Sequence, residues 1–279
     1  MTLPVAGEGI TATATRQGGV GAAAARLVLP VVVLVAVIGA WEAVVRIYHI
    51  APYVLPGPAA VFSTLIEDRQ VLFDSLLVTL TTTLEGFVAA ALGGIALALL
   101  FSRSRLLEYS LFPYAVVLQV TPVIAIAPLL LIYLPQQVAV VVCAFIVAFF
   151  PVLANTTLGL NSADRNLAGL FTLYGASPVQ SLWYLRLPAA LPYILGGLRI
   201  AGGLSLIGAV VAEIAAGSAG AGSGLAYRIA ESSYRLNIPR MFAALVLLSV
   251  AGVVIYMALS LVSHLVLRRW HESALGKEI

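Results

Sequence analysis

The sequence predicts an all-α polytopic membrane protein with six transmembrane helices. Of its 279 residues, 61% are hydrophobic and 10% are charged, and the mean hydropathy is +1.05. Soluble domains contain about 45–50% apolar and about 25% charged residues, so this composition is typical of a chain that lies mostly in a lipid bilayer. The net charge of +3 comes without a basic cluster, which argues against a nucleic-acid partner.

The first segment, residues 1–26, is polar and low in complexity, and we expect it to be a disordered cytoplasmic tail. The transmembrane domain is expected at residues 27–270, followed by a cytoplasmic C-terminal tail at 271–279. Six runs reach the length of about 20 apolar residues that spans a bilayer; they are 27–48, 75–101, 111–134, 137–160, 191–216 and 241–267. Pro135 and Gln136 alone separate the third run from the fourth, which predicts a tight hairpin.

The distribution of positive charge predicts the orientation of these spans. If the N-terminus lies inside, ten of the 15 Lys and Arg residues fall in inner segments and five in outer ones. Since inner loops carry the excess of Lys and Arg, we expect both termini and the loop at 161–190 to be cytoplasmic. The outer segments are then 49–74 and 217–240, where Pro, Gly and polar residues leave room for partial structure.

Small residues recur at four-residue spacing in the second and fifth spans. They are Gly86, Ala90, Gly94 and Ala98 in the second span, and Gly197, Ala201, Ser205 and Ala209 in the fifth. Lipid supplies no hydrophobic drive for helices to associate, so close contacts depend on small side chains. We interpret these stripes first as static packing seams, and alternatively as seams that shear during gating.

Polar residues and prolines within the spans are candidates for a transport pathway. A proline frees a backbone carbonyl, which protein or water has to satisfy because lipid has no donor. Glu213, near the outer end of the fifth span, is an acid of the kind that faces a bundle interior or a cavity. The alternatives are a simple packing kink in the third span and an interfacial position for Glu213. The candidate pathway residues are Gln119, Thr121, Pro122, Asn155, Ser205 and Glu213.

Missing motifs exclude several chemistries. The chain has no GxxxxGK[ST] sequence, so it has no P-loop with which to bind ATP. It has no HExxH motif and no cluster of metal ligands, and its one cysteine, Cys143, lies in an apolar run. No serine has a histidine or lysine partner at a matching depth, which argues against an intramembrane protease. We therefore expect a non-enzyme with no catalytic residue, metal or cofactor of its own.

The loop at 161–188 is a moderately polar segment whose residues predict two short helices. Asn161 or Ser162 is expected to cap the first helix, which would end near Tyr174. Gly175 suits the left-handed position just past that end. Two capped helices between membrane spans favour an interaction with a soluble partner.

The second loop helix is predicted from its own start and stop signals. Ser177 is expected to cap it, with Pro178 at the first position and Gln180 completing a capping box. The helix should end near Leu185, because Pro188 cannot continue it.

The spacing in this loop resembles the EAA loop of ABC importer permeases. That family has Glu-Ala-Ala, three residues, Gly, nine residues, Ile, one residue and Leu-Pro. Gly175, Leu185, Leu187 and Pro188 match this pattern, whereas Gly169-Leu170-Phe171 stands where the family has Glu-Ala-Ala. The resemblance extends from about residue 51 onward to the nitrate, sulfonate and taurine permeases, through segments such as Leu55-Pro56-Gly57-Pro58 and Ala212-Glu213.

The resemblance implies the type I ABC importer permease fold, with the second loop helix acting as a coupling helix that sits in a groove of a separate ATPase. Val179, Leu182 and Leu185 recur at three-residue spacing and are expected to form its docking face, with Trp183 and Tyr184 as anchors. The residues implied in coupling are Gly175, Ala176, Ser177, Pro178, Val179, Leu182, Trp183, Leu185, Leu187 and Pro188.

The same resemblance implies an assembly in the bacterial inner membrane. A second permease copy, expected to form a homodimer, would join two cytoplasmic ATPases that use ATP and Mg²⁺ and an extracytoplasmic substrate-binding protein. The solute would be small, of the nitrate, sulfonate and taurine class or the pyrimidine-precursor class. The alternative is a self-contained secondary transporter, which predicts inverted repeats and ion ligands near the middle of the membrane; the sequence shows no convincing repeat and few charges within its spans.

Overall fold

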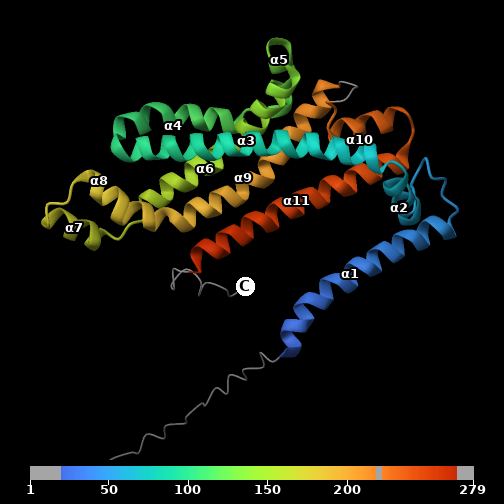
Figure 1. The fold of residues 1–279 in the computed structure, drawn as a ribbon, viewed down its shortest axis with the longest axis horizontal. Helices are drawn as coiled ribbons and strands as arrows, with labels where there is room; N and C mark the ends of the chain where they lie inside the picture. Colours follow the sequence, from blue (N-terminus) through green and yellow to red (C-terminus); the bar gives the residue numbers. More distant parts are fainter. Residues whose placement is uncertain (1–19, 218–221, 269–279) are drawn as a thin grey trace, which may run out of the picture.

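A computed structural model describes residues 20–217 and 222–268 of the chain. The predicted tails at 1–26 and 271–279 lie outside these residues, except that residues 20–26 form the start of a helix rather than a tail. The described residues confirm the all-α class (Figure 1). In chain order their elements are α1 (Val20–Ile47), α2 (Pro58–Glu67), α3 (Arg69–Arg103), α4 (Arg105–Val120), α5 (Val123–Tyr133), α6 (Gln136–Leu160), α7 (Arg165–Leu173), α8 (Pro178–Ser181), the π-helical turn η1 (Leu182–Arg186), α9 (Leu187–Ala216), α10 (Leu225–Tyr234) and α11 (Ile238–Leu267).

Five helical segments of the described chain are long and apolar enough to cross a membrane, and each contains most of one predicted span. The third predicted span, 111–134, is interrupted at a proline for which a break or kink is predicted: α4 and α5 meet there at a bend of 98°. Thr121 and Pro122 have extended backbone at the bend. Pro122 lacks an amide donor and disfavours the helical conformation in the residue before it. Counted as one broken span, this pair brings the number to the six predicted.

The core of the bundle is built around α6, which packs closely against both α3 and α9 (Figure 1). The predicted stripes of small residues lie at these interfaces and are buried. A Cβ added to Gly86 would lie 2.5 Å from the Ala144 Cβ, and one added to Gly208 would lie 2.7 Å from the Cys143 carbonyl oxygen. The prediction of close packing seams is therefore confirmed.

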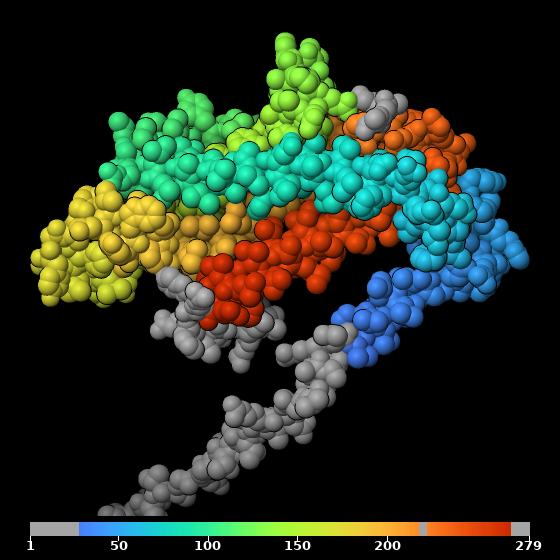
Figure 2. Space-filling view, in the orientation of Figure 1, coloured from blue at the N-terminus to red at the C-terminus, as the bar shows by residue number. Residues whose placement is uncertain are grey.

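The helix α1 stands apart from the bundle and joins it near its own C-terminal end (Figures 1 and 2), where Trp41 packs against Phe242 of α11. No residue of its apolar segment, 28–47, is buried. The short helices α2 and α10, within the predicted outer segments, lie at that end of the bundle, and α7 and α8 lie at the opposite end. Following the predicted orientation, we call these the outer end and the inner end.

Candidate functional sites at the two ends of the bundle

At the inner end, α7 is capped by a residue other than those predicted. Asp164 Oδ1 accepts hydrogen bonds from two amides of the first turn, at 2.7 and 3.2 Å. Asn161 instead ends α6, and the Ser162 hydroxyl donates to the Gly159 carbonyl at 2.8 Å. An acidic cap accepts the amides and also complements the positive end of the helix dipole, which explains why α7 begins directly after Asp164.

The turn between α7 and α8 has the predicted geometry. Gly175 has a φ of +69°, a conformation that glycine adopts without steric cost, and the Ala176 amide donates back to the Phe171 carbonyl at 2.9 Å. The Ser177 amide donates to Gln180 Oε1 at 2.7 Å, and the Gln180 amide donates to Ser177 Oγ at 3.2 Å. This reciprocal capping box fixes the start of α8.

The second loop helix does not end at Leu185 as predicted. It passes through η1 directly into α9, so residues 178–216 form one helical path. The Leu187 amide donates to the carbonyl of Leu182, five residues earlier, which is the hydrogen-bond register of a π-turn. Pro188 then falls in the first turn of α9, directly after this change of register, which lets the helix continue although Pro188 has no amide to donate. The loop helix is therefore continuous with a membrane span.

The exposed side of this path differs from the predicted docking face. Trp183, Tyr184 and Val179 have 61%, 75% and 48% of their surface exposed, and we call these three residues the aromatic face. Leu185 is only 9% exposed and Leu182 packs against the buried core, because the π-turn interrupts the regular three-residue stripe. Of the other predicted coupling residues, the structure exposes Gly175, Ser177 and Pro178 and partly buries Ala176, Leu187 and Pro188.

At the outer end, Glu213 is buried, with 3% of its surface exposed, which contradicts the alternative of an interfacial position. Its Oε2 accepts hydrogen bonds from the Thr79 hydroxyl at 3.0 Å and from the Ala226 amide at 3.1 Å. The Leu225 amide donates to Thr79 Oγ1 at 2.8 Å. Leu225 and Ala226 begin α10, so the two side chains satisfy amides that a helix N-terminus leaves unpaired. This contact joins α3, α9 and α10.

A polar cavity of about 310 Å³ lies beside this contact. Its lining includes the side chains of Thr81, Thr82, Gln136, Gln137 and Glu213. Glu213 Oε1, the oxygen not used to hold α10, has no hydrogen-bond partner among the described residues. The described lining therefore offers a carboxylate oxygen, hydroxyls and side-chain amides, and contains no positively charged group.

The other predicted pathway residues do not gather at this cavity. The Ser205 hydroxyl donates to a carbonyl of α3 at 2.8 Å, within the seam between α3 and α9. The Asn155 side chain donates to a carbonyl one turn earlier in α6 at 2.8 Å. Three more, Gln119, Thr121 and Pro122, lie at the bend between α4 and α5. Among the predicted pathway residues, Glu213 is the one that lines the cavity.

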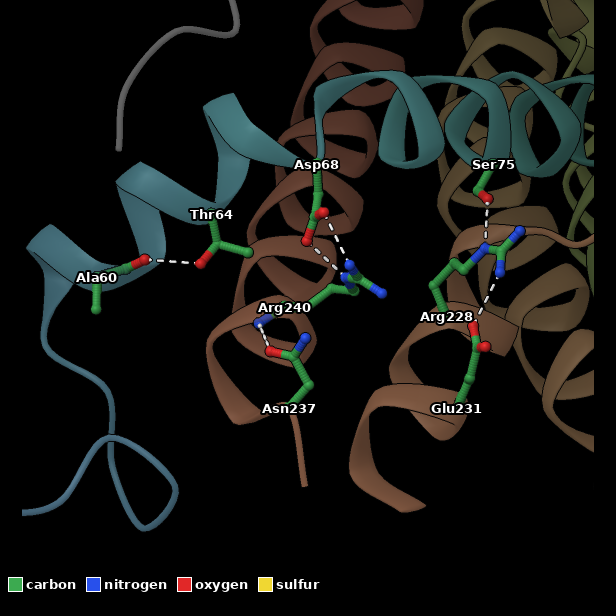
Figure 3. Close-up of polar contacts among 8 residues, drawn as sticks. All are labelled: Ala60, Thr64, Asp68, Ser75, Arg228, Glu231, Asn237 and Arg240. Carbon is green, nitrogen blue, oxygen red and sulfur yellow. Dashed lines mark hydrogen bonds and ion pairs between the residues drawn. The ribbon is translucent and has the colours of Figure 1, made fainter. Parts of the chain in front are cut away.

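A cluster of ion pairs at the outer end was missed by the sequence analysis (Figure 3). Arg240 of α11 donates from Nε and Nη2 to the two carboxylate oxygens of Asp68, at 2.6 and 2.8 Å. Nearby, Arg228 of α10 donates to Ser75 of α3 at 3.0 Å and to Glu231 at 2.8 Å. We call these five residues the outer clasp. The spacing of Arg228 and Glu231 is visible in the sequence, whereas Asp68 and Arg240 lie 172 positions apart.

Comparison with known proteins gives a consistent set of relatives. The family model described as "Binding-protein-dependent transport system inner membrane component" matches residues 90–272. A "Probable ABC transporter permease protein" of Haemophilus influenzae is 33% identical over 86% of this chain and 96% of its own length. The formylaminopyrimidine transport permease ThiX of Halalkalibacterium halodurans is 32% identical over 81% of this chain and 90% of its own.

Among solved structures, a crystal structure of an amino acid ABC transporter with histidines is similar in fold. The TM-score is 0.60 and the sequence identity is 20%, with 73% of this chain and 97% of that chain covered. At this identity the likeness concerns the fold alone.

Proposed function

This chain belongs to the family of binding-protein-dependent transport system inner membrane components and is the permease subunit of an ABC importer. On this premise we propose a separate role for each end of the bundle. The inner end couples transport to a separate ATPase that uses ATP and Mg²⁺. The outer end receives the solute from a substrate-binding protein. A second permease copy and a second ATPase complete the assembly in the bacterial inner membrane, with both termini of this chain in the cytoplasm.

The observation that carries the coupling role is the aromatic face on a helical path that continues into a span. Large apolar side chains exposed at the end of a membrane domain are typical of a protein contact. Because α8, η1 and α9 are continuous, a displacement of Trp183 is passed along the path towards Glu213 at its far end. The ATPase shifts the equilibrium between inward-facing and outward-facing states by binding one of them more tightly.

We assign the polar cavity beside Glu213 to the outer part of the pathway. A carboxylate without a neighbouring positive charge disfavours anions and suits a neutral solute that donates hydrogen bonds. Among the relatives, ThiX is named for formylaminopyrimidine and RibX for riboflavin, whereas SsuC, NrtB and CmpB are named for sulfonates, nitrate and bicarbonate. The cavity favours the first group, so the proposed substrate is a neutral, hydrogen-bonding solute of the pyrimidine-precursor class.

Reconstitution in proteoliposomes tests this proposal. The chain is assembled with an ATPase and a substrate-binding protein of the same organism, and uptake of labelled formylaminopyrimidine and of nitrate is followed with and without ATP. We expect ATP-dependent uptake of the pyrimidine that requires all the subunits. Uptake by the chain alone, driven by an ion gradient, would establish the secondary transporter instead. ATP-dependent uptake of nitrate without uptake of the pyrimidine would overturn the substrate class and leave the coupling role intact.

A further inference from the structure

Two adjoining cavities lie at the inner end, between the last turn of α3, the start of α4, the end of α6 and the coupling helix. The larger has a volume of about 390 Å³, and its polar lining consists of Ser102, Arg103, Thr172, Ser181 and Arg186. The smaller, of about 220 Å³, shares Ser102 and Arg186 with it and adds further polar groups from α4 and α6. Side chains from α3, α4, α6, α7, α8 and η1 therefore surround one polar space.

The charges around this space are unbalanced. The larger cavity has two guanidinium groups and no acidic group in its lining, and the smaller adds Arg105 and one carboxylate, that of Glu108. Among the residues that the structure describes, the guanidinium groups of Arg103, Arg105 and Arg186 form neither a hydrogen bond nor an ion pair. Arg103 and Arg105 are exposed and Arg186 is half-buried, so at least one guanidinium faces this space with part of its hydration lost and with no acceptor from the chain. The arrangement therefore favours the binding of an anion from outside the chain.

We propose that the larger cavity binds a phosphate-type oxyanion, and that the phosphate group of an anionic phospholipid is its normal occupant. Guanidinium groups bind phosphate through paired hydrogen bonds, and the Ser181 hydroxyl supplies a further donor. The hydroxyls of Ser102 and Thr172 donate to carbonyls of their own helices. The larger cavity lies at the C-terminal end of α3, and the smaller one extends to the end of α6. We expect these inner ends of two spanning helices to lie at the depth of the lipid headgroups. Basic pockets between transmembrane helices at this depth bind such headgroups.

An oxyanion in this cavity would connect the coupling helix to the bundle. Arg186 belongs to η1, immediately before α9, whereas Arg103 is the last residue of α3. A phosphate that binds both guanidinium groups holds η1 against the end of α3. The consequence for coupling rests on the proposed function, but the binding of the anion does not.

Lipid binding to the full-length chain, purified in detergent and depleted of lipid, tests the proposal directly. Phosphatidylglycerol is titrated and the bound lipid is counted by native mass spectrometry, with millimolar inorganic phosphate as a separate arm read by the shift in melting temperature. For the double variant Arg103→Gln/Arg186→Gln we expect the apparent Kd for phosphatidylglycerol to rise at least about tenfold, which corresponds to the loss of one charge-assisted contact.

Arg165→Gln is the matched control, because Arg165 is an exposed inner arginine on α7 that lines neither cavity. It should bind the lipid as the unmodified chain does, and the double variant Arg103→Lys/Arg186→Lys should keep part of the affinity. Arginine-dependent stabilisation by inorganic phosphate, without lipid binding, would retain the oxyanion site and assign it to free phosphate. Equal lipid and phosphate binding by the Gln variant, with a monodisperse elution profile, would overturn the proposal even if coupling to the ATPase is intact.

Discussion

Two glutamates at the outer end do the same task for two different helices. Gly224 precedes α10 and Gly57 precedes α2, and neither glycine has a side chain with which to cap its helix. Glu213 accepts a hydrogen bond from the amide of Ala226, the second residue of α10, at 3.1 Å, and Glu42 from the amide of Ala59, the second residue of α2, at 3.4 Å. A Cβ on Gly224 or Gly57 would lie 2.2 or 2.8 Å from the respective carboxylate. Glycine at these positions therefore lets a carboxylate from another helix act as the cap, where it also complements the helix dipole.

Replacement of Gly224 by alanine is expected to lower the free energy of unfolding by about 1–3 kcal/mol, the cost of leaving a buried polar group unsatisfied. The new methyl group displaces the Glu213 carboxylate and leaves the Ala226 amide of α10 without its acceptor. Unfolding of the purified chain in detergent micelles measures the effect. Gly222→Ala is the matched control, since nothing lies within 4 Å of a Cβ at that position; an equal loss in both variants would contradict the role assigned to the close contact.

At the scale of residues, the sequence predicts a side chain's role where its partner is a near neighbour. Gly175 and the capping box of Ser177 and Gln180 are confirmed because every contact in them spans a few positions. The cap that Glu213 provides depends on Thr79, which lies 134 positions away. No local pattern marks such a pair, because helix packing and not chain spacing brings the two side chains together.

Among the helices, the seam between α6 and α9 depends on the absence of side chains. Gly208→Ala would place a methyl group 2.7 Å from the Cys143 carbonyl oxygen and 2.8 Å from the Ala144 Cα. Because backbone atoms cannot move aside alone, we expect a loss of about 1–3 kcal/mol, as for other overpacked sites. Thermal unfolding and the yield of monodisperse protein provide the measurement. Gly203→Ala, in the same helix but with open space around the new methyl group, should behave as the unmodified chain does.

The coupling helix has an exposed face for a partner and a buried face against the bundle. Substitutions on the two faces should affect ATPase binding and stability separately. Trp183→Glu places a charge on the aromatic face, so we expect ATPase binding to fall at least about tenfold, as for an interface hot spot, with little change in the stability of the chain. Leu182→Ala removes a side chain that packs on the core, and it should lower stability by about 1–3 kcal/mol. Pull-down of the ATPase and thermal unfolding of each variant measure the two properties. Unchanged ATPase binding by Trp183→Glu would refute the coupling assignment.

The long helices were predictable from apolar run length and the loop helices α7 and α8 from their capping residues, but the effect of each proline was not. Pro122 ends a helix with extended backbone on both sides of the bend, whereas Pro188 lies within a continuous helical path. The difference depends on whether the neighbouring backbone can pair the carbonyl that the proline, which has no amide, leaves without a donor. The π-turn before Pro188 does so by a change of register, and the predicted docking face changed with it. The sequence contains both prolines but no pattern that distinguishes these outcomes.

At the scale of the whole molecule, the arginines of the two ends differ in whether they form ion pairs. At the outer end Arg46, Arg228, Arg235 and Arg240 each form an ion pair with a carboxylate. The arginines around the inner cavities have no such partner in the described chain. Total charge counts, which predicted the orientation, do not reveal this difference. The outer end is therefore stabilised by its own ion pairs, whereas the inner end can bind external anions. This difference suits a protein that changes its contacts mainly at the inner end.

The outer clasp is expected to hold its helices as one unit, and a double-mutant cycle tests this. For Asp68→Asn and Arg240→Gln we expect a coupling energy of about 1.5–3 kcal/mol in unfolding, because the pair is bidentate and mostly shielded from solvent. Glu42 and Arg46 are the matched control, since the Arg46 side chain is 73% exposed and such pairs contribute less than about 1 kcal/mol. Equal, small coupling in both cycles would show that α2 and α3 move independently of α11, and that the outer end is as adaptable as the inner one.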